Sequence, residues 1–327
     1  MNILFTSAGR RTYLVKYFKL LGHKVHCVNS DEYSPAMHFA DHSLQVPLTS
    51  SPDFIKIILE YSRENQIDLI IPLTDLDVLK FSENIQIFRD LGVKVLVSPL
   101  EAVLICSDKW VTYKILRESG ISQPKTFQNL KNLILDLGKK LVDFPILMKP
   151  TLGFGSKGII EITNMEELEF MHRFYSTKMH NINLDGSNKY IYQEKIKGEE
   201  FALTILNDNS AIYLDSFSVK KVSMRSGETE AGYVVIDQYL ENLAKKLSHT
   251  FKHHFLAEVD LIKSEDRFYP IDINLRFAGS YPFLHSSGIN LPEQILRILN
   301  GLAYENQSSR LSENKTFVKD MQLIELI

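Results

Sequence analysis

Strand-like and helix-like segments alternate through the first hundred residues of the chain. Apolar runs typical of strands lie at 3–6, 24–29, 68–73 and 93–97, and helical patterns lie at 12–21, 54–61 and 75–91. Continuous apolar strands separated by amphipathic helices predict a parallel sheet covered by helices on both faces. The first turn, at 7–11, carries one glycine where a dinucleotide site needs three, so we do not expect this sheet to bind NAD.

The composition is that of an ordinary globular protein. Of the 327 residues, 44% are hydrophobic and 24% are charged, and the net charge of −3 gives no basic field for nucleic acid or anionic lipid. No apolar run approaches the ~20 residues that cross a bilayer, and the run at 1–5 is too short for a signal peptide. The two cysteines, Cys27 and Cys106, lie far apart in apolar surroundings. We expect a cytoplasmic protein of two or three domains, without a nucleic-acid or membrane partner.

A glycine-rich loop follows the apolar run at 144–150, and its three glycines have the spacing G-x-G-x-x-G: Gly153, Gly155 and Gly158. A dinucleotide site needs a helix after such a loop, whereas the residues at 159–163 alternate like a strand. No Walker A sequence is present either. The pattern predicts a hairpin tip with Lys149 before it, which can place backbone N–H groups over phosphate oxygens. An ordinary glycine-containing hairpin remains open at this point.

The second half of the chain has a different pattern. Ser107 is expected to cap a helix that ends at Gly120. From residue 189 onward, strand-like runs lie at 190–195, 201–207, 211–219, 255–262 and 268–274, with one helix at about 238–249. Short links between these strands predict an antiparallel sheet with a helix, distinct from the first region.

Acidic residues lie on the last two of these strands. A short turn at 263–267 places Asp260 and Asp272 opposite each other, and Asn274 shares a strand face with Asp272. Opposed carboxylates repel unless a cation lies between them, and two carboxylates with an amide oxygen suit Mg²⁺. Arg276 follows on the same face as a donor for phosphate. A solvent-facing polar strand is the alternative.

Five ordered segments resemble the ATP-grasp superfamily, closest in style to its carbamoyl phosphate synthetase large-subunit-like branch. The segments are Ser107–Lys109, Phe144–Pro150 with the glycine loop, Tyr192–Phe201, Met224–Thr229 and Asp272–Arg276. The resemblance covers nearly the whole chain. It implies an α/β Rossmann-like parallel sheet, the pre-ATP-grasp domain, at 1–105, followed by two α+β ATP-grasp subdomains. The small subdomain with the glycine flap would occupy 106–188, and the antiparallel-sheet subdomain with the magnesium site would occupy 189–327.

The resemblance also implies a role for each motif residue. ATP would be bound by Lys109, Lys149, Gly153, Gly155, Ser156, Gly158, Glu194, Lys195, Ile196 and Glu200. The lysines would hold the α- and β-phosphates and the glycine loop would close over the triphosphate. Glu194 and the backbone of 195–196 would meet adenine, and Glu200 would bind ribose. Asp260, Asp272 and Asn274 would bind Mg²⁺, with Mn²⁺ as an alternative, while Arg225 and Arg276 would be catalytic, facing the γ-phosphate and the phosphorylated substrate.

Two residues depart from the family pattern. Many relatives have Glu where Asp272 stands, and a longer carboxylate bridges two metals more easily, so the number of metal ions stays open. Leu275 stands where a proline is common, which mainly affects the local backbone. Outside the family context, Lys109 would more often be a solvated cation at a helix start. Glu194 would be an exposed strand-end acid, and Arg225 a loop cation.

The implied activity is an ATP-dependent ligase that converts a carboxylate to an acylphosphate and joins it to an amine (or a thiol), forming ADP and phosphate. ATP and Mg²⁺ would bind between the two ATP-grasp subdomains. This activity implies small-molecule carboxylate and amine substrates, and the resemblance leaves open whether the protein forms a homodimer. Candidates for the acceptor site are 7–11, Asp31, 74–75 and 279–290; Arg10 and Arg11 there oppose the helix dipole, which favours an anion. A carbamate- or carbonate-phosphorylating enzyme is one alternative, which the short chain without internal duplication disfavours. A non-catalytic ATP-binding regulator is another, which the full set of metal ligands with both arginines disfavours.

Overall fold

The computed structural model describes residues 1–327 except 154–157, 180–189, 226, 308–310, 312–314 and 325–327. The described chain divides into two compact units. The first contains residues 1–104, 202–259 and 274–327, and the second contains residues 105–201 and 260–273. Each unit is therefore built from segments that are distant in sequence.

A five-stranded parallel sheet opens the first unit and confirms the predicted alternation. Its strands are β1 (Asn2–Thr6), β2 (Lys24–Asn29), β3 (His42–Gln45), β4 (Leu69–Pro72) and β5 (Lys94–Val95), in the order β3-β2-β1-β4-β5. Its helices are α1 (Thr12–Leu20), α2 (Pro35–Phe39), α3 (Phe54–Glu64), α4 (Asp75–Glu83) and α5 (Ile85–Asp90). The single helix expected at 75–91 is two helices, because Asn84 ends α4 and bonds back to the Lys80 carbonyl.

The strand order reverses between β1 and β4, and the loops that leave their carboxyl ends meet there. Parallel α/β sheets bind ligands at such a switch point. The loop after β1 turns through positive φ angles at Ser7 and Gly9 before α1 begins. On the other side, Thr74 caps α4, and the buried carboxylate of Asp77 accepts a hydrogen bond of 2.8 Å from Thr6 at the end of β1. Residues 7–11 and 74–75 are therefore fixed at one edge of the sheet.

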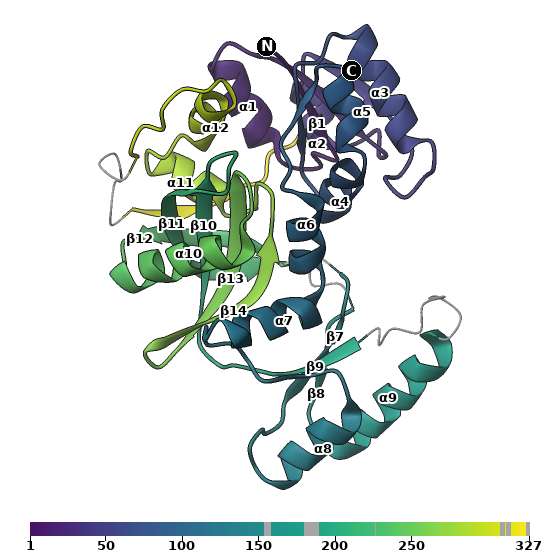
Figure 1. Ribbon diagram of the computed structural model, residues 1–327, viewed down its shortest axis with the longest axis vertical. Coiled ribbons are helices and arrows are strands. Elements are labelled where there is room, and N and C mark those ends of the chain that lie inside the picture. Colours follow the sequence, from purple (N-terminus) through teal and green to yellow (C-terminus); the bar gives the residue numbers. More distant parts are fainter. Residues whose placement is uncertain (154–157, 180–189, 226, 308–310, 312–314, 325–327) are drawn as a thin grey trace. The chain divides into compact units, whose positions relative to one another are not determined.

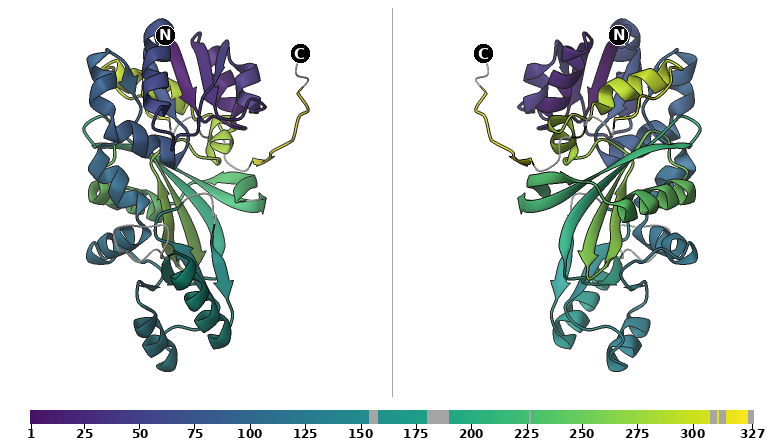
Figure 2. Two further views of the ribbon diagram at one scale, coloured as in Figure 1. Left: turned by 90° about the vertical axis from the view of Figure 1, so that its right-hand side faces the viewer. Right: turned by 90° about the vertical axis from the view of Figure 1, so that its left-hand side faces the viewer.

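A six-stranded sheet has the order β14-β13-β10-β11-β12-β15. Its strands are β10 (Glu199–Asn207), β11 (Tyr213–Arg225), β12 (Glu228–Val235), β13 (Leu256–Ser264), β14 (Arg267–Asn274) and β15 (Thr316–Val318). Helix α10 (Gln238–Phe251) lies along β11 on one face (Figure 2), and α11 (Tyr281–Ser286) and α12 (Leu291–Leu299) follow β14. Within the first unit, side chains of the parallel sheet, β10–β12 and these last two helices share one apolar core.

The second unit has a four-stranded sheet of order β6-β9-β7-β8. Its strands are β6 (Thr126–Phe127), β7 (Ile146–Pro150), β8 (Ile160–Ile162) and β9 (Tyr190–Glu194), and its helices are α7 (Lys109–Glu118), α8 (Leu130–Gly138) and α9 (Met165–Met179), with α6 (Leu100–Ser107) leading into it. Helices α8 and α9 pack on the sheet (Figure 1) through Leu133 and Leu168. The sequence groups the strand at 190–195 with those after it, whereas β9 pairs with β6 and β7, because long-range pairing decides sheet membership. The boundaries at 105 and 188 stay predictions.

Among the described residues, no helix is long and apolar enough to cross a membrane. Most polar groups in the interior are hydrogen-bonded, and His253 is an exception. It follows α10, it is 1% exposed, and neither of its ring nitrogens has a partner within the described part of the chain. Burial lowers the pKa of this imidazole from 6.5 to about 4.

The buried histidine makes stability sensitive to acid. The folded protein binds the proton of His253 less readily than the unfolded chain, so stability is present above pH 6.5 and is lost as pH falls toward 4. The loss amounts to as much as about 3 kcal/mol for a shift of this size. We expect His253→Leu to flatten the dependence of urea-unfolding free energy on pH. The exposed His249→Leu is the control, and equal slopes in the two variants would contradict the expectation.

Candidate active site

The start of α7 positions the first predicted phosphate ligand. Asp108, not Ser107 as expected, is the N-cap: its carboxylate accepts from the backbone N–H of Trp110 (2.8 Å) and Val111 (2.9 Å), because Ser107 still belongs to α6. The backbone N–H of Lys109 donates to the Thr151 carbonyl at 3.0 Å. This bond ties the helix start to the segment that follows β7, so the glycine loop and Lys109 are held together.

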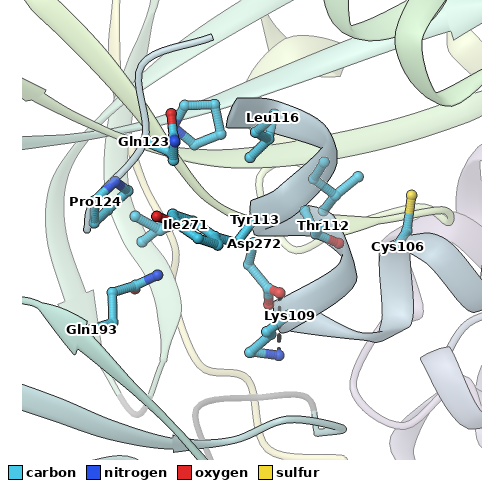
Figure 3. Close-up of a pocket in the computed structure, with 12 residues that line it drawn as sticks. Cys106, Lys109, Thr112, Tyr113, Leu116, Gln123, Pro124, Gln193, Ile271 and Asp272 are labelled. Carbon is cyan, nitrogen blue, oxygen red and sulfur yellow. Dashed lines mark ion pairs between the residues drawn. The ribbon is translucent and has the colours of Figure 1, made fainter. Parts of the chain in front are cut away.

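The Lys109 side chain joins the glycine loop to β14. Its Nζ donates to the Gly153 carbonyl at 2.7 Å and lies 3.4 Å from Oδ1 of Asp272. The lysine side chain is 13% exposed, so this ion pair is screened less than a surface pair. Figure 3 shows Lys109 reaching from α7 toward Asp272. Two residues that the sequence assigned to different ligands, phosphate and metal, are thus in direct contact.

Lys149 is the second cation at this place. It is 5% exposed on β7, and its Nζ donates to Oε1 of Gln193 on β9 at 2.6 Å. Its pKa is lowered to about 8, mainly by burial: Lys109 also lowers the pKa, while Asp272 and, to a smaller extent, Asp260 raise it. The structure therefore brings two predicted phosphate ligands and two predicted metal ligands into one electrostatic neighbourhood. Gln193 was missed, although a polar residue within an apolar strand was a signal for it.

A pocket of the second unit opens beside these charges. It is lined by α7 and the segment after it, by β9 and by β14: Cys106, Lys109, Thr112, Tyr113, Leu116, Gln123, Pro124, Gln193, Pro270, Ile271, Asp272 and Ile273. In Figure 3 Leu116 and Pro124, with Gln123 beside them, lie away from the Lys109–Asp272 pair. The lining thus combines apolar side chains with a charged pair, as small-molecule pockets do.

The predicted adenine and ribose residues lie between the end of β9 and the start of β10. Glu194 exchanges hydrogen bonds with the backbone of Lys125: its carboxylate accepts from the Lys125 N–H at 3.1 Å, and its own N–H donates to the Lys125 carbonyl at 2.9 Å. Lys195 makes an exposed ion pair of 2.6 Å with Glu161, Ile196 is partly buried, and Glu200 is exposed. Gly198 passes so close to the Lys263 carbonyl that a Cβ would lie 2.0 Å from its oxygen. That contact fixes the 195–198 link.

The glycine loop joins two strands, as predicted. Strands β7 and β8 are antiparallel on either side of it, with Met148 opposite Ile160. Gly158 adopts a φ of 76°, which favours glycine, and the Gly153 carbonyl accepts a hydrogen bond from Lys109. Gly155 and Ser156 lie outside the described residues. The strand-loop-strand context removes the dinucleotide interpretation, because no helix N-terminus follows the loop.

The predicted metal ligands lie on adjacent strands. Asp260 is on β13 and Asp272 on β14, both partly exposed, and Asn274 ends β14. Among the described residues there is no group of three His, Cys, Asp or Glu side chains suited to a metal ion. Two carboxylates and an amide provide oxygen atoms alone, a donor set that fits Mg²⁺ completed by phosphate and water. The assignment stays a prediction.

Arg276 is held by a partner that the sequence did not pair with it. In the first unit, its guanidinium donates to both carboxylate oxygens of Asp75, at 2.9 and 2.7 Å, and to Oδ1 of Asn274 at 3.0 Å. Both side chains are largely buried, at 12% and 20% exposure. Asp75 is the first residue of α4, at the switch point of the parallel sheet. The pair therefore fixes the end of β14 to the acceptor region predicted at 74–75.

Arg225 makes an ion pair with a residue of the neighbouring strand. It ends β11 as a strand residue rather than a loop residue, its side chain is 63% exposed, and it pairs with Glu230 at 3.1 Å. The catalytic role of Arg225 stays a prediction.

Among the acceptor candidates, His285 is packed against aromatic residues. Its ring stacks on Tyr17 with centroids 3.5 Å apart, and its Nδ1 forms a hydrogen bond of 2.8 Å with the Tyr281 hydroxyl. Burial lowers the pKa of the His285 imidazole.

The sequence matches two protein-family models. Residues 106–280, more than half of the chain, match the model of the ATP-grasp domain. The chain belongs to the ATP-grasp family. Residues 3–96 match a second model, the PylC-like N-terminal domain. This ATP-grasp protein is also 20% identical over 288 residues to the carbamoyl phosphate synthase large chain of Pseudothermotoga lettingae; the match covers 84% of this chain and a quarter (25%) of that protein.

Solved structures share the fold. The biotin carboxylase–β-γ-ATP complex from Campylobacter jejuni superimposes with a TM-score of 0.76 at 18% identity, over 96% of this chain and 74% of that one. The biotin carboxylase domain of Hydrogenobacter thermophilus 2-oxoglutarate carboxylase, in complex with MgADP and bicarbonate, gives a TM-score of 0.74 at 14% identity, over 96% and 73%. At such identities the likeness concerns the fold alone.

Proposed function

We propose that this ATP-grasp protein is an ATP-dependent ligase that phosphorylates a substrate carboxylate and transfers the acyl group to an amine. The observation that carries the proposal is the convergence of Lys109, Lys149 and Asp272 beside a pocket with apolar side chains in its lining. Two cations in a partly desolvated place suit the phosphates of a nucleotide, and the apolar lining suits its base. The glycine loop lies next to these cations, since the Gly153 carbonyl accepts a hydrogen bond from Lys109.

Each group then has a task in the reaction. Lys109 and Lys149 hold and neutralise the phosphates, and Glu194 and the 195–196 backbone bind the base. Asp260, Asp272 and Asn274 would hold Mg²⁺, which supplies positive charge for the transferred phosphoryl group. Before the nucleotide binds, Asp272 is paired with Lys109. When the nucleotide binds, its phosphates replace Asp272 as the partner of Lys109.

Chemically, a carboxylate oxygen of the substrate attacks the γ-phosphorus, and the bond to the β-phosphate oxygen breaks to release ADP. The amine then attacks the acyl carbon, loses a proton and expels inorganic phosphate. Arg276 stabilises the charge that develops on the phosphoryl group, and its fixed bidentate bond to Asp75 keeps it from reorganising during the step. No side chain of the protein has to become a covalent nucleophile.

The experiment combines nucleotide binding with trapping of the acylphosphate. Hydroxylamine should convert the intermediate to a hydroxamate in the presence of ATP, Mg²⁺ and the acid, without the amine. Lys149→Ala should weaken ATP binding in calorimetry roughly tenfold to a hundredfold, because a charge-assisted bond is lost; the exposed Lys139→Ala is the control. An acid that stimulates ADP release but gives neither hydroxamate nor phosphate–carboxylate oxygen exchange would refute ligation through an acylphosphate.

Bicarbonate is the second candidate acid. It is favoured by the match to a carbamoyl phosphate synthase large chain, the branch whose carbamate- or carbonate-phosphorylating chemistry the sequence resembles. ADP release that depends on bicarbonate alone, without any organic acid, would support this alternative. Tight ATP binding without ADP release under any of these conditions would leave a nucleotide-binding regulator.

A further inference from the structure

Gln193 on β9 contacts both strands that flank it, and the reaction above gives this side chain no task. Strand β9 lies between β6 and β7 in the four-stranded sheet. Gln193 stands directly opposite Thr126 on β6 and Leu147 on β7. Lys149 stands two residues after Leu147, so its side chain emerges on the same face of the sheet. The side chains of Thr126, Gln193 and Lys149 therefore form a row across three strands.

A series of hydrogen bonds joins these three side chains. The Lys149 Nζ donates to the Gln193 Oε1 at 2.6 Å, and the Gln193 Nε2 donates to the Thr126 hydroxyl at 3.0 Å. The Thr126 hydroxyl donates in turn to the Pro124 carbonyl at 3.0 Å. Lys149, Gln193 and Thr126 are 5%, 7% and 4% exposed. Because all three are buried, each polar group depends on its protein partner rather than on water.

Both ends of this series impose the same orientation on the Gln193 amide. The Pro124 carbonyl can only accept, so it takes the single proton of the Thr126 hydroxyl, and the hydroxyl oxygen must accept from the amide NH₂ group. At the other end, the Lys149 ammonium can only donate, and it requires the amide oxygen. A flipped amide would turn its NH₂ group toward the ammonium and would lose both hydrogen bonds.

The series reaches from the pocket to a predicted phosphate ligand. Gln193 and Pro124 both line the pocket (Figure 3). The Lys149 ammonium has three donors, and among the described residues Gln193 accepts one of them. Two donors are left for phosphate oxygens, so the amide holds the ammonium without competing with a nucleotide. The amide also keeps the ammonium from turning toward the carboxylates of Asp272 and Asp260, which attract it.

We propose that Gln193 and Thr126 are positioning residues of the nucleotide site. Thr126 fixes the Gln193 amide, and the amide oxygen holds the Lys149 ammonium where the phosphates bind. A lysine side chain has many rotamers, and ordering it at the moment of binding costs affinity, a cost that the amide removes beforehand. Thr126 does not line the pocket, so it acts on the nucleotide only through its hydrogen-bond partners. This role rests on the proposed function, because it concerns how that site binds ATP.

The first test compares ligands with and without phosphates on the full chain. Calorimetry measures ADP with Mg²⁺ and adenosine, and the fluorescence of Trp110, the single tryptophan, is a second readout. Trp110 stacks on Tyr113 of the pocket lining, with ring centroids 5.3 Å apart. Gln193→Met keeps the length of the side chain and removes both hydrogen bonds, so affinity for ADP should fall at least tenfold. Affinity for adenosine should fall far less, because adenosine has no phosphate for Lys149.

Variants at Thr126 test the orientation of the amide. Thr126→Val keeps the shape and removes the hydroxyl that fixes the amide, so affinity for ADP should fall about fivefold. Thr126→Ser keeps the hydroxyl and should bind ADP like the parent protein. Thr204→Val, a similarly buried change on β10, is the control and should also bind like the parent. In the double variant of Gln193→Met and Thr126→Val, the loss should not exceed that of Gln193→Met alone.

The same measurements can overturn the proposal. Parental affinity for ADP in Gln193→Met and Thr126→Val, together with weak binding in Lys149→Ala, would refute the positioning role and leave the nucleotide site intact. Equal losses for ADP and adenosine would show that the variants disturb the pocket wall rather than Lys149. Additive losses in the double variant would show that Thr126 does not act through the amide. A parent protein that binds neither ADP nor ATP would refute the proposed function together with this role. If Gln193→Met does not fold, the comparison of Thr126→Val with Thr126→Ser decides.

Discussion

Asp272→Asn is expected to lower kcat by on the order of a thousandfold while ATP binding changes far less. The carboxylate matters most when charge develops on the transferred phosphoryl group, so its loss raises the barrier more than it weakens the ground-state complex. Asparagine keeps the size of the side chain and one oxygen, and it removes the negative charge next to Lys109. The measurement is steady-state ADP release at saturating Mg²⁺ and ATP, paired with calorimetric ATP affinity.

A matched control lies on the turn before the same strand. Asp266→Asn removes an exposed carboxylate between β13 and β14 and should leave kcat and affinity unchanged. A variant at Asp272 that retains parental kcat would show that the acids on β13 and β14 are not the metal site. The electrostatics also predict that the pKa of Lys149 falls further in Asp272→Asn, because Asp272 is the larger of the two carboxylate influences that raise it.

Arg276→Ala is expected to slow hydroxamate trapping about a hundredfold, the loss typical of removing one donor that stabilises developing negative charge. Its effect should fall on the chemical step, since the guanidinium is already fixed by Asp75 and Asn274 before any substrate binds. Single-turnover trapping with saturating ATP measures it. The exposed Arg267→Ala, at the start of the same strand, should behave like the parent protein.

A variant at Asp75 distinguishes the structural role of Arg276 from its role in the reaction. Removing one partner of a largely buried pair leaves the other charge uncompensated, so Asp75→Ala should cost about 3 kcal/mol of unfolding free energy. If Asp75 acts by holding Arg276, the double variant should trap no more slowly than Arg276→Ala alone. Additive losses in the double variant would mean that the two residues act independently on the reaction.

Local patterns in the sequence predicted a large part of the fold. The period of the apolar residues between 3 and 97 identified the alternation of strands and helices, because side chains that share a face repeat with the geometry of the element. The strand after Gly158 distinguished the glycine loop from a dinucleotide site on the same local grounds. The paired acids Asp260 and Asp272 were recognisable because they interrupt apolar strands joined by a short turn.

Tertiary structure decided which of these residues act together. Lys109 influences the charge of Lys149 because the N–H of Lys109 bonds to Thr151, just after β7, and the pairing of β7 with β9 buries Lys149 against Gln193. Asp75 lies 201 residues from Arg276, and Lys319 reaches Glu228 through the pairing of β15 with β12. Periodicity and spacing report on neighbours along the chain. Contacts over such separations depend on the order of strands and on desolvation, which exist only once the chain has folded.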